Sequence, residues 1–158
     1  MVKSKEVVLI LHNVRSAHNV GAIFRTAEAA GVNQIYLTGY TPAPIDRFGR
    51  PNHELVKTAL GAEKIVEWSI SKNPTNLIKK LEANSYKLVA LEQSSNSINY
   101  KKVKIVGPTA IIVGNEVTGL NKTILKKCDV VAEIPMHGRK ESLNVAVATG
   151  IFLFSLLK

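Results

Sequence analysis

The amino-acid sequence predicts an α/β fold, with a mostly parallel sheet and helices on both faces. Short runs rich in Val, Ile and Leu alternate along the chain with segments whose apolar residues recur at helical spacing. The short runs are apolar throughout rather than at every second position, which is typical of strands covered on both faces. Because strands and helices alternate, a parallel sheet is the expected arrangement.

The strands are expected at the apolar runs and the helices between them. The runs cover residues 6–11, 34–38, 64–68, 87–92, 109–114 and 130–136. Helices are expected at residues 20–30, 53–60, 75–84, 121–127 and 142–157, with Pro74 and Asn121 near two of the starts. Two long loops, 39–52 and 93–104, carry positive charge at Arg47, Arg50, Lys101, Lys102 and Lys104, which suits either contact with a phosphate backbone or an ordinary solvated surface.

The length and charge of the chain limit the classes of function. A chain of 158 residues fits one domain, residues 1–158, with a core that needs no metal or disulfide. The formal net charge of +9 makes an acidic polymer the first partner to consider, and nucleic acid is favoured over a membrane surface. Cys128 is the only cysteine and no leader-like segment opens the chain, so an intracellular, cytoplasmic location is expected. The apolar stretch 145–157 is shorter than the roughly 20 residues that cross a bilayer and is interpreted as a buried helix.

Unusual polar residues gather in three segments, each directly after a predicted strand. The segments are 13–25, 114–121 and 134–148. In open α/β sheets ligands bind at the carboxyl ends of the strands, so one shared pocket is expected. The four histidines and the single cysteine show no metal-ligand spacing, and no metal is expected.

The first segment holds side chains with more than one possible role. Asn19 precedes an apolar helical pattern and either caps that helix or faces the pocket. Arg25 lies off the apolar stripe and either forms a surface pair with Glu28 or takes part in function. Arg15 has no obvious local partner, and a phosphate contact is expected for it.

The other two segments also combine capping candidates with pocket candidates. Glu116 either caps the helix that starts near Asn121 or places a carboxylate in the pocket. Ser142 is expected as the N-cap of the last helix. Asn144 lies two residues further on, among apolar neighbours, and its amide needs a partner if it is buried. A partner helix or a substrate would supply one.

Three motifs in these segments follow one another along the chain. They comprise Asn19, Gly21 and Arg25; then Gly114, Glu116, Gly119 and Leu120; and then Ile134, Pro135, Met136, Ser142, Leu143, Asn144 and Val145. In this order, and over nearly the whole chain, they resemble the SpoU–TrmH family of SPOUT methyltransferases, which methylate ribose 2′-hydroxyls of tRNA or rRNA with S-adenosyl-L-methionine. The chain resembles a minimal form of that family, without an added N-terminal RNA-binding domain.

The resemblance implies a fold, a cofactor site and a set of reacting groups. The C-terminal half is expected to form a trefoil knot. The cofactor S-adenosyl-L-methionine is expected to lie against Leu91, Gly114, Ile134, Met136, Ser142 and Leu143. The reacting side would comprise Arg25, Asn19, Glu116, Ser142 and Asn144. Guanidinium groups hold their proton too tightly to be good bases, so phosphate anchoring and alkoxide stabilisation are favoured for Arg25. A base role there would need a phosphate that shifts the proton.

RNA and a second copy of the chain are the expected partners, and DNA is not. The C-terminal helix is apolar nearly all round and has no polar face for solvent, so a homodimer interface is expected to cover it. The alternative function is a catalytically inactive RNA-binding protein of the same fold, against which the intact motif residues argue. A nucleotide enzyme with a phosphate loop is a weaker alternative, because neither glycine-rich phosphate motif occurs.

Overall fold

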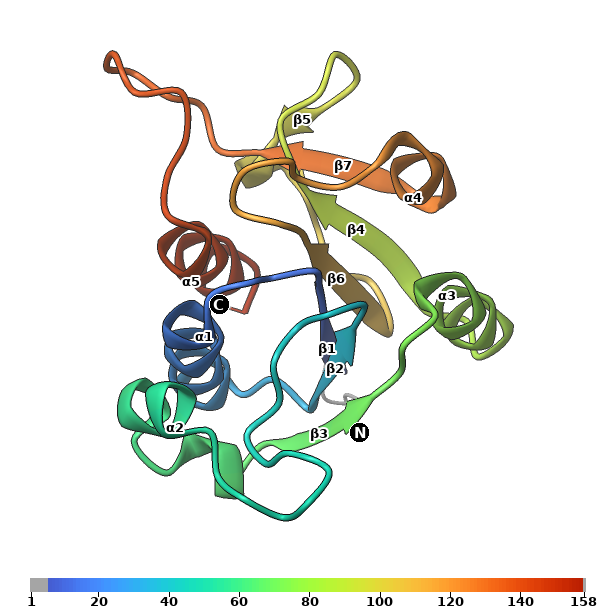
Figure 1. Cartoon of the computed structure of the whole chain (residues 1–158). Coiled ribbons are helices and arrows are strands. Elements are labelled where there is room, and N and C mark those ends of the chain that lie inside the picture. Colours follow the sequence, from blue (N-terminus) through green and yellow to red (C-terminus); the bar gives the residue numbers. More distant parts are fainter. Residues whose placement is uncertain (1–5, 158) are drawn as a thin grey trace.

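A seven-stranded parallel sheet forms the centre of the structure, a computed structural model that describes residues 6–157 (Figure 1). The strands follow the order β3-β2-β1-β6-β4-β7-β5 across the sheet, and every neighbouring pair is parallel. Their bounds are β1 Val7–His12, β2 Gln34–Thr38, β3 Glu67–Ile70, β4 Lys87–Leu91, β5 Ile98–Asn99, β6 Thr109–Val113 and β7 Val130–Glu133. The predicted α/β class and parallel sheet are therefore confirmed.

Helices cover both faces of this sheet (Figure 1). One face is covered by α1 (Ala17–Ala30), α2 (His53–Ala59) and α5 (Val145–Leu156), and the other by α3 (Pro74–Ala83) and α4 (Lys122–Lys127). Successive side chains of β1 point to opposite faces, so that Leu9 joins the first core and Ile10 the second. Both side chains are fully buried, which explains why the strands are apolar at every position.

Three details of the strands differ from the prediction. Residues 98–99 form a short edge strand, β5, inside a segment predicted as a loop. β3 begins at Glu67, because residues 62–64 form a 3-10 turn. β7 ends at Glu133 rather than at residue 136, because Pro135 has no backbone N–H to donate to a ladder. The chain after β7 is thereby released from the sheet and is free to line the site described below.

The start of α1 is set by Ser16 rather than by Asn19. The Ser16 hydroxyl accepts a hydrogen bond from the backbone N–H of Asn19 at 3.1 Å, and the helix begins at Ala17. The helix therefore starts three residues earlier than the predicted residue 20. Asn19 lies inside its first turn, which leaves its side chain available for other contacts.

The start of α5 is set by Asn144 rather than by Ser142. The Asn144 side-chain oxygen accepts from the backbone N–H groups of Ala146 at 2.8 Å and Val147 at 3.3 Å. This is the geometry of an N-cap, in which a side-chain oxygen satisfies free helix donors. The expected capping role of Ser142 was wrong, because the helix begins two residues later than that role requires.

Gly21 lies where α1 and α2 are in contact. A Cβ atom at this position would collide with the Thr58 hydroxyl and the Leu55 carbonyl oxygen, both of α2. Glycine therefore lets the two helix backbones approach closely. This glycine of the first motif has a packing role, and the contact holds α2 beside the first half of α1.

One side of α5 is buried and the other is exposed. Phe152 and Leu153 are fully buried, whereas Val147 is 51% exposed and Phe154 is 55% exposed. Burial against the sheet, expected from the apolar sequence, therefore holds for one face of the helix only. Among residues 6–157, no helix combines the length and the apolar character needed to cross a membrane.

Candidate active site

The candidate site lies at the carboxyl edge of the sheet, where the chain leaves β4, β6 and β7. These strands are neighbours, because β6 pairs with β4 and β4 pairs with β7. A cleft of about 360 Å³ opens beside them and is closed by the starts of α1 and α5. Its lining residues are Asn19, Leu91, Glu92, Gln93, Val113, Gly114, Asn115, Glu116, Glu133, Ile134, Met136, Ser142, Leu143, Asn144, Val145 and Ala148. Each of the three polar segments therefore contributes to one cleft.

All of the residues expected to hold a cofactor lie at this cleft. They are Leu91, Gly114, Ile134, Met136, Ser142 and Leu143. Most of them bring apolar side chains, and the backbone of the released segment after β7 adds polar groups. Apolar walls with a few polar groups are typical of small-molecule sites, whose volumes start at about 300 Å³.

Glu116 connects the loop after β6 to the start of α1. Its carboxylate accepts hydrogen bonds from the backbone N–H of Arg15 and of Ser16, both at 3.1 Å, and from the side-chain amide of Asn19 at 3.3 Å. A carboxylate at a helix start also interacts favourably with the helix dipole. Glu116 thus holds the first and second motifs together across the cleft. It does not cap α4, whose N-cap is Asn121.

The hydrogen bonds around Glu116 keep its carboxylate ionised. Partial burial on its own would raise the pKa of Glu116. Hydrogen bonds outweigh this effect and lower the pKa below its ordinary value. The donors are the backbone N–H groups of Glu116 itself, Ser16 and Arg15, and the side-chain amide of Asn19. At neutral pH the group is therefore an acceptor that positions its neighbours.

A chain of side-chain hydrogen bonds continues from Glu116 to the start of α5. The Asn19 amide donates to Glu116, and its oxygen accepts from the side-chain amide of Asn144 at 3.1 Å. The oxygen of Asn144 caps α5, so each of the two amides has its orientation fixed on both sides. A partner was expected for the Asn144 amide only if it was buried; the side chain is exposed, and its amide nevertheless bonds to Asn19.

The structure places Arg25 outside this cleft. Arg25 follows Asn19 by six residues, which is roughly 600° around a helix, so the two side chains lie on different faces of α1. Arg25 lines a second groove, between α1, α2 and the end of α5, together with Lys57, Leu60 and Phe154. The possible pair with Glu28 is not formed: among the described residues, Arg50 and Asp46 make the one ion pair.

Glu92 is a site residue that the sequence did not single out. One of its carboxylate oxygens accepts from the backbone N–H of Leu120 at 2.9 Å, and the other from that of Gln93 at 3.0 Å. It therefore ties the second motif to the end of β4. A carboxylate at the carboxyl end of a predicted strand was the available signal, but from the run 87–92 only Leu91 was assigned to the site.

Asn115 was also not predicted and organises the same loop. Its amide nitrogen donates to the carbonyl oxygen of Asn13 at 3.1 Å and to the Tyr40 hydroxyl at 3.0 Å. Its oxygen accepts from the backbone N–H groups of Val117 and Thr118. The loops after β1, β2 and β6 are thereby connected. Within residues 6–157, no group of His, Cys, Asp and Glu side chains is arranged to hold a metal ion.

Comparison with known proteins agrees with this arrangement. The model of the SpoU rRNA Methylase family matches residues 6–154, which include all three motifs. The chain belongs to this family. Its sequence is 33% identical over 152 residues to the tRNA (guanosine(18)-2′-O)-methyltransferase of Aquifex aeolicus, an alignment that covers 96% of this chain and 69% of that enzyme.

Two further relatives are longer than this chain. The 23S rRNA (guanosine-2′-O-)-methyltransferase RlmB of Pseudomonas aeruginosa is 32% identical, over 96% of this chain and 58% of its own length. The crystal structure of an AdoMet-bound rRNA methyltransferase from Sinorhizobium meliloti superimposes with a TM-score of 0.87 at 32% identity, covering 97% of this chain and 56% of that one. The chain therefore spans little more than half the length of these two relatives.

Proposed function

We propose that the protein transfers a methyl group from S-adenosyl-L-methionine to a ribose 2′-hydroxyl of tRNA or rRNA. The observation that carries this proposal is the single cleft to which all three motifs contribute, in a chain of the SpoU family. Relatives over 30% identical are named as 2′-O-methyltransferases of tRNA and of rRNA, so the choice between these substrates stays open. The proposal takes residues 1–158 as one methyltransferase domain in the cytoplasm, and the trefoil knot stays a prediction.

The chemical character of the cleft fits S-adenosyl-L-methionine. Leu91, Ile134 and Met136 offer apolar surface for a purine ring. The carboxylates of Glu92 and Glu133 lie in the same lining and favour a ligand that carries positive charge. When bound, this cofactor supplies an electrophilic methyl group, and the protein's task is to hold the accepting oxygen in line with it.

The polar chain from Glu116 to Asn144 is the part of the cleft suited to holding a ribose. Its two amides present oriented donors and acceptors, and the nearby Ser142 adds a hydroxyl. Fixed donors of this kind stabilise the negative charge that builds up on the 2′-oxygen as its proton leaves, before the methyl group is transferred. Among the reacting residues expected from the motifs, only Arg25 is missing from the cleft of its own chain.

A homodimer would bring Arg25 to a cleft. Val147, Ile151 and Phe154 form an exposed apolar stripe along α5, and the exposed Leu143 lies just before the helix. Leu143 lines the cleft, and Phe154 lines the groove that also holds Arg25. A two-fold contact places the same surface against itself. If two α5 helices pair in antiparallel orientation, the Phe154 end of one meets the Leu143 end of the other. Arg25 of each protomer would then complete the cleft of its partner.

The dimer proposal predicts that a charge on the α5 stripe separates the protomers. Ile151→Glu is expected to sediment as a monomer, because a buried carboxylate without a partner opposes association. Val106→Glu, at a position that is 92% exposed and outside the stripe, is the matched control and should remain a dimer. A wild-type chain that sediments as a monomer at micromolar concentration would contradict the proposal.

The proposed function predicts cofactor binding without RNA. S-adenosyl-L-methionine or S-adenosylhomocysteine should give saturable heat in calorimetry, and Ile134→Ala should weaken binding by about 10-fold, the scale of one lost apolar contact. Val106→Ala is the control and should bind normally. Transfer of labelled methyl to bulk tRNA and rRNA, followed by nucleoside analysis for 2′-O-methylation, then tests the reaction. No heat with either compound would reject the proposal, and RNA binding without cofactor binding would favour an inactive RNA-binding protein.

A further inference from the structure

Residues 45–51 form a tight hairpin in the long loop between β2 and α2. Ile45 and Pro51 form an antiparallel bridge, and the backbone N–H of Gly49 donates to the carbonyl oxygen of Asp46 at 3.0 Å. Gly49 has a φ of 77°, a left-handed conformation that favours glycine and that this kind of turn requires. The turn therefore has a defined conformation, although it is not part of the sheet.

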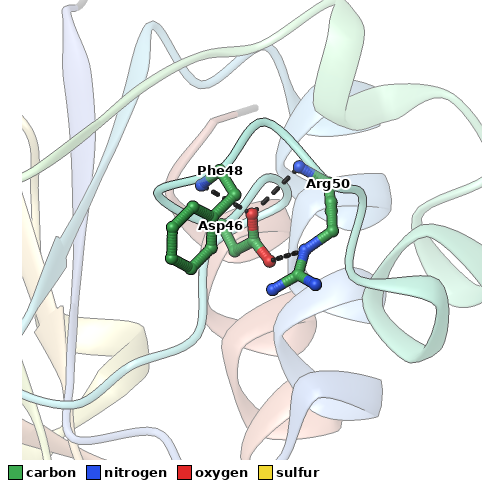
Figure 2. A network of polar contacts seen from close by, with 3 residues as sticks. All are labelled: Asp46, Phe48 and Arg50. Carbon is green, nitrogen blue, oxygen red and sulfur yellow. Dashed lines mark hydrogen bonds and ion pairs between the residues drawn. The ribbon is translucent and has the colours of Figure 1, made fainter.

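The Asp46 carboxylate holds the tip of this hairpin together (Figure 2). It accepts from the backbone N–H of Phe48 at 2.8 Å and of Arg50 at 2.9 Å, and from the Arg50 side-chain Nε at 2.9 Å. These contacts, led by the Arg50 backbone N–H, lower the pKa of Asp46 below its ordinary value. The carboxylate is thus charged at neutral pH, and the three residues keep fixed relative positions.

The hairpin presents an aromatic ring between two cations. Phe48 is 67% exposed, and the guanidinium carbons of Arg47 and Arg50 lie 4.8 Å and 5.0 Å from the centre of its ring. In the part of the chain that the structure describes, no carboxylate pairs with Arg47. The two terminal nitrogens of Arg50 have no hydrogen-bond partner there either, and Figure 2 shows them extending beyond the contact with Asp46. An exposed aromatic ring beside guanidinium donors that have no partner is suited to binding a ligand with a flat ring and a negative charge.

We propose that Arg47, Phe48 and Arg50 bind an unpaired nucleotide of the RNA substrate, and this inference rests on the proposed function. Single-stranded RNA is bound by stacking its bases on aromatic rings and guanidinium planes while cations contact the phosphates. The hairpin offers both kinds of group within one turn. A guanidinium also matches a phosphate with two parallel donors.

The position of the hairpin relative to the cleft supports RNA as the occupant. The loop that carries it begins at the site: the Tyr40 hydroxyl accepts from Asn115, a cleft residue, and the Thr41 hydroxyl accepts from the backbone N–H of Val14. The loop then runs to the hairpin and on to α2 (Figure 1). An RNA strand with its ribose in the cleft would therefore find a second contact along the same loop.

Direct binding measurements test this inference. Fluorescence anisotropy with a labelled, unpaired RNA of roughly 12 nucleotides and mixed sequence is the assay, with total tRNA as competitor. Phe48→Ala should weaken binding by about 5-fold or more, the lower end of what one stacked base contributes, and Phe48→Tyr should restore it. Arg47→Ala should weaken binding and flatten its salt dependence. Both positions are exposed, so the variants should melt like the wild type.

The controls separate the hairpin from general positive charge and from the reaction. Lys79→Ala removes an exposed cation from α3, on the opposite face of the sheet, and should leave RNA affinity unchanged. Cofactor binding by calorimetry should be normal in every hairpin variant. Wild-type RNA affinity in both Phe48→Ala and Arg47→Ala would overturn this inference and point to a protein partner for the hairpin. A wild-type chain that binds RNA through the hairpin but transfers no methyl group would instead overturn the proposed function alone.

Discussion

Replacing Arg25 with alanine is expected to reduce methyl transfer by roughly 10²-fold or more, the scale of a lost transition-state donor. Folding and cofactor binding should change little, because Arg25 lies outside the cleft proposed to bind the cofactor and has no ion-pair partner among residues 6–157. Single-turnover transfer to RNA beside a thermal melt measures both quantities. Arg25→Lys keeps the positive charge but loses the planar guanidinium group. It should restore little activity if Arg25 binds a phosphate through two parallel hydrogen bonds.

Mixed dimers test whether Arg25 acts on the partner's cleft. Arg25→Ala and Glu116→Ala chains are each expected to be nearly inactive on their own. If Arg25 acts on the partner's cleft, a dimer with one chain of each kind has one site that carries both substitutions and one site that carries neither. Random mixing should therefore restore about a quarter of wild-type activity, because half of the two-fold dimers are mixed and each has one intact site of two. Absence of any restoration would show that Arg25 and Glu116 act within the same chain. An Arg25→Ala protein that methylates at the wild-type rate would remove Arg25 from the reaction.

Replacing Glu116 with alanine is expected to lower both stability and methyl transfer. The backbone N–H groups of Arg15 and Ser16 and the Asn19 amide would lose their acceptor. Because the site is partly open to water, the free energy of unfolding should fall by about 1 kcal/mol, the lower end for donors left unpaired. Methyl transfer should fall much further, since Asn19 and through it Asn144 lose their orientation. Urea unfolding and single-turnover transfer give the two values, and a wild-type rate would contradict the role assigned to this carboxylate.

Glu116→Gln separates the charge from the shape of this side chain. The folded-state pKa of Glu116 is lowered from its ordinary value of 4.5, so the charged form stabilises the fold. That contribution is fully present above pH 4.5 and is lost as the pH falls through the lower pKa of the folded state. The stability of the wild type should therefore fall relative to that of Glu116→Gln over this acidic range. Parallel stability curves for the two proteins would contradict the lowered pKa.

The sequence by itself determined the sheet, the order of its main elements and the location of the site. Strands such as β1 are buried on both faces, and this requires an apolar side chain at every position, which is visible without a structure. A parallel sheet then brings all carboxyl ends to one edge, so that three polar segments had to meet there. β5 was missed because a two-residue edge strand forms by pairing with β7 and has no apolar pattern of its own.

Only the tertiary structure decided which side chains act together. Ser16 and Asn144, rather than Asn19 and Ser142, cap their helices, because a cap depends on where the preceding loop places an oxygen. The acceptor of the two backbone amides just before α1 is Glu116, about a hundred residues away along the chain, and no local pattern records such a pair. Arg25 was grouped with the cleft because it follows Asn19 in one motif. Helical rotation turns it instead into a groove beside Phe154, and only the dimer proposed above would bring it to a cleft.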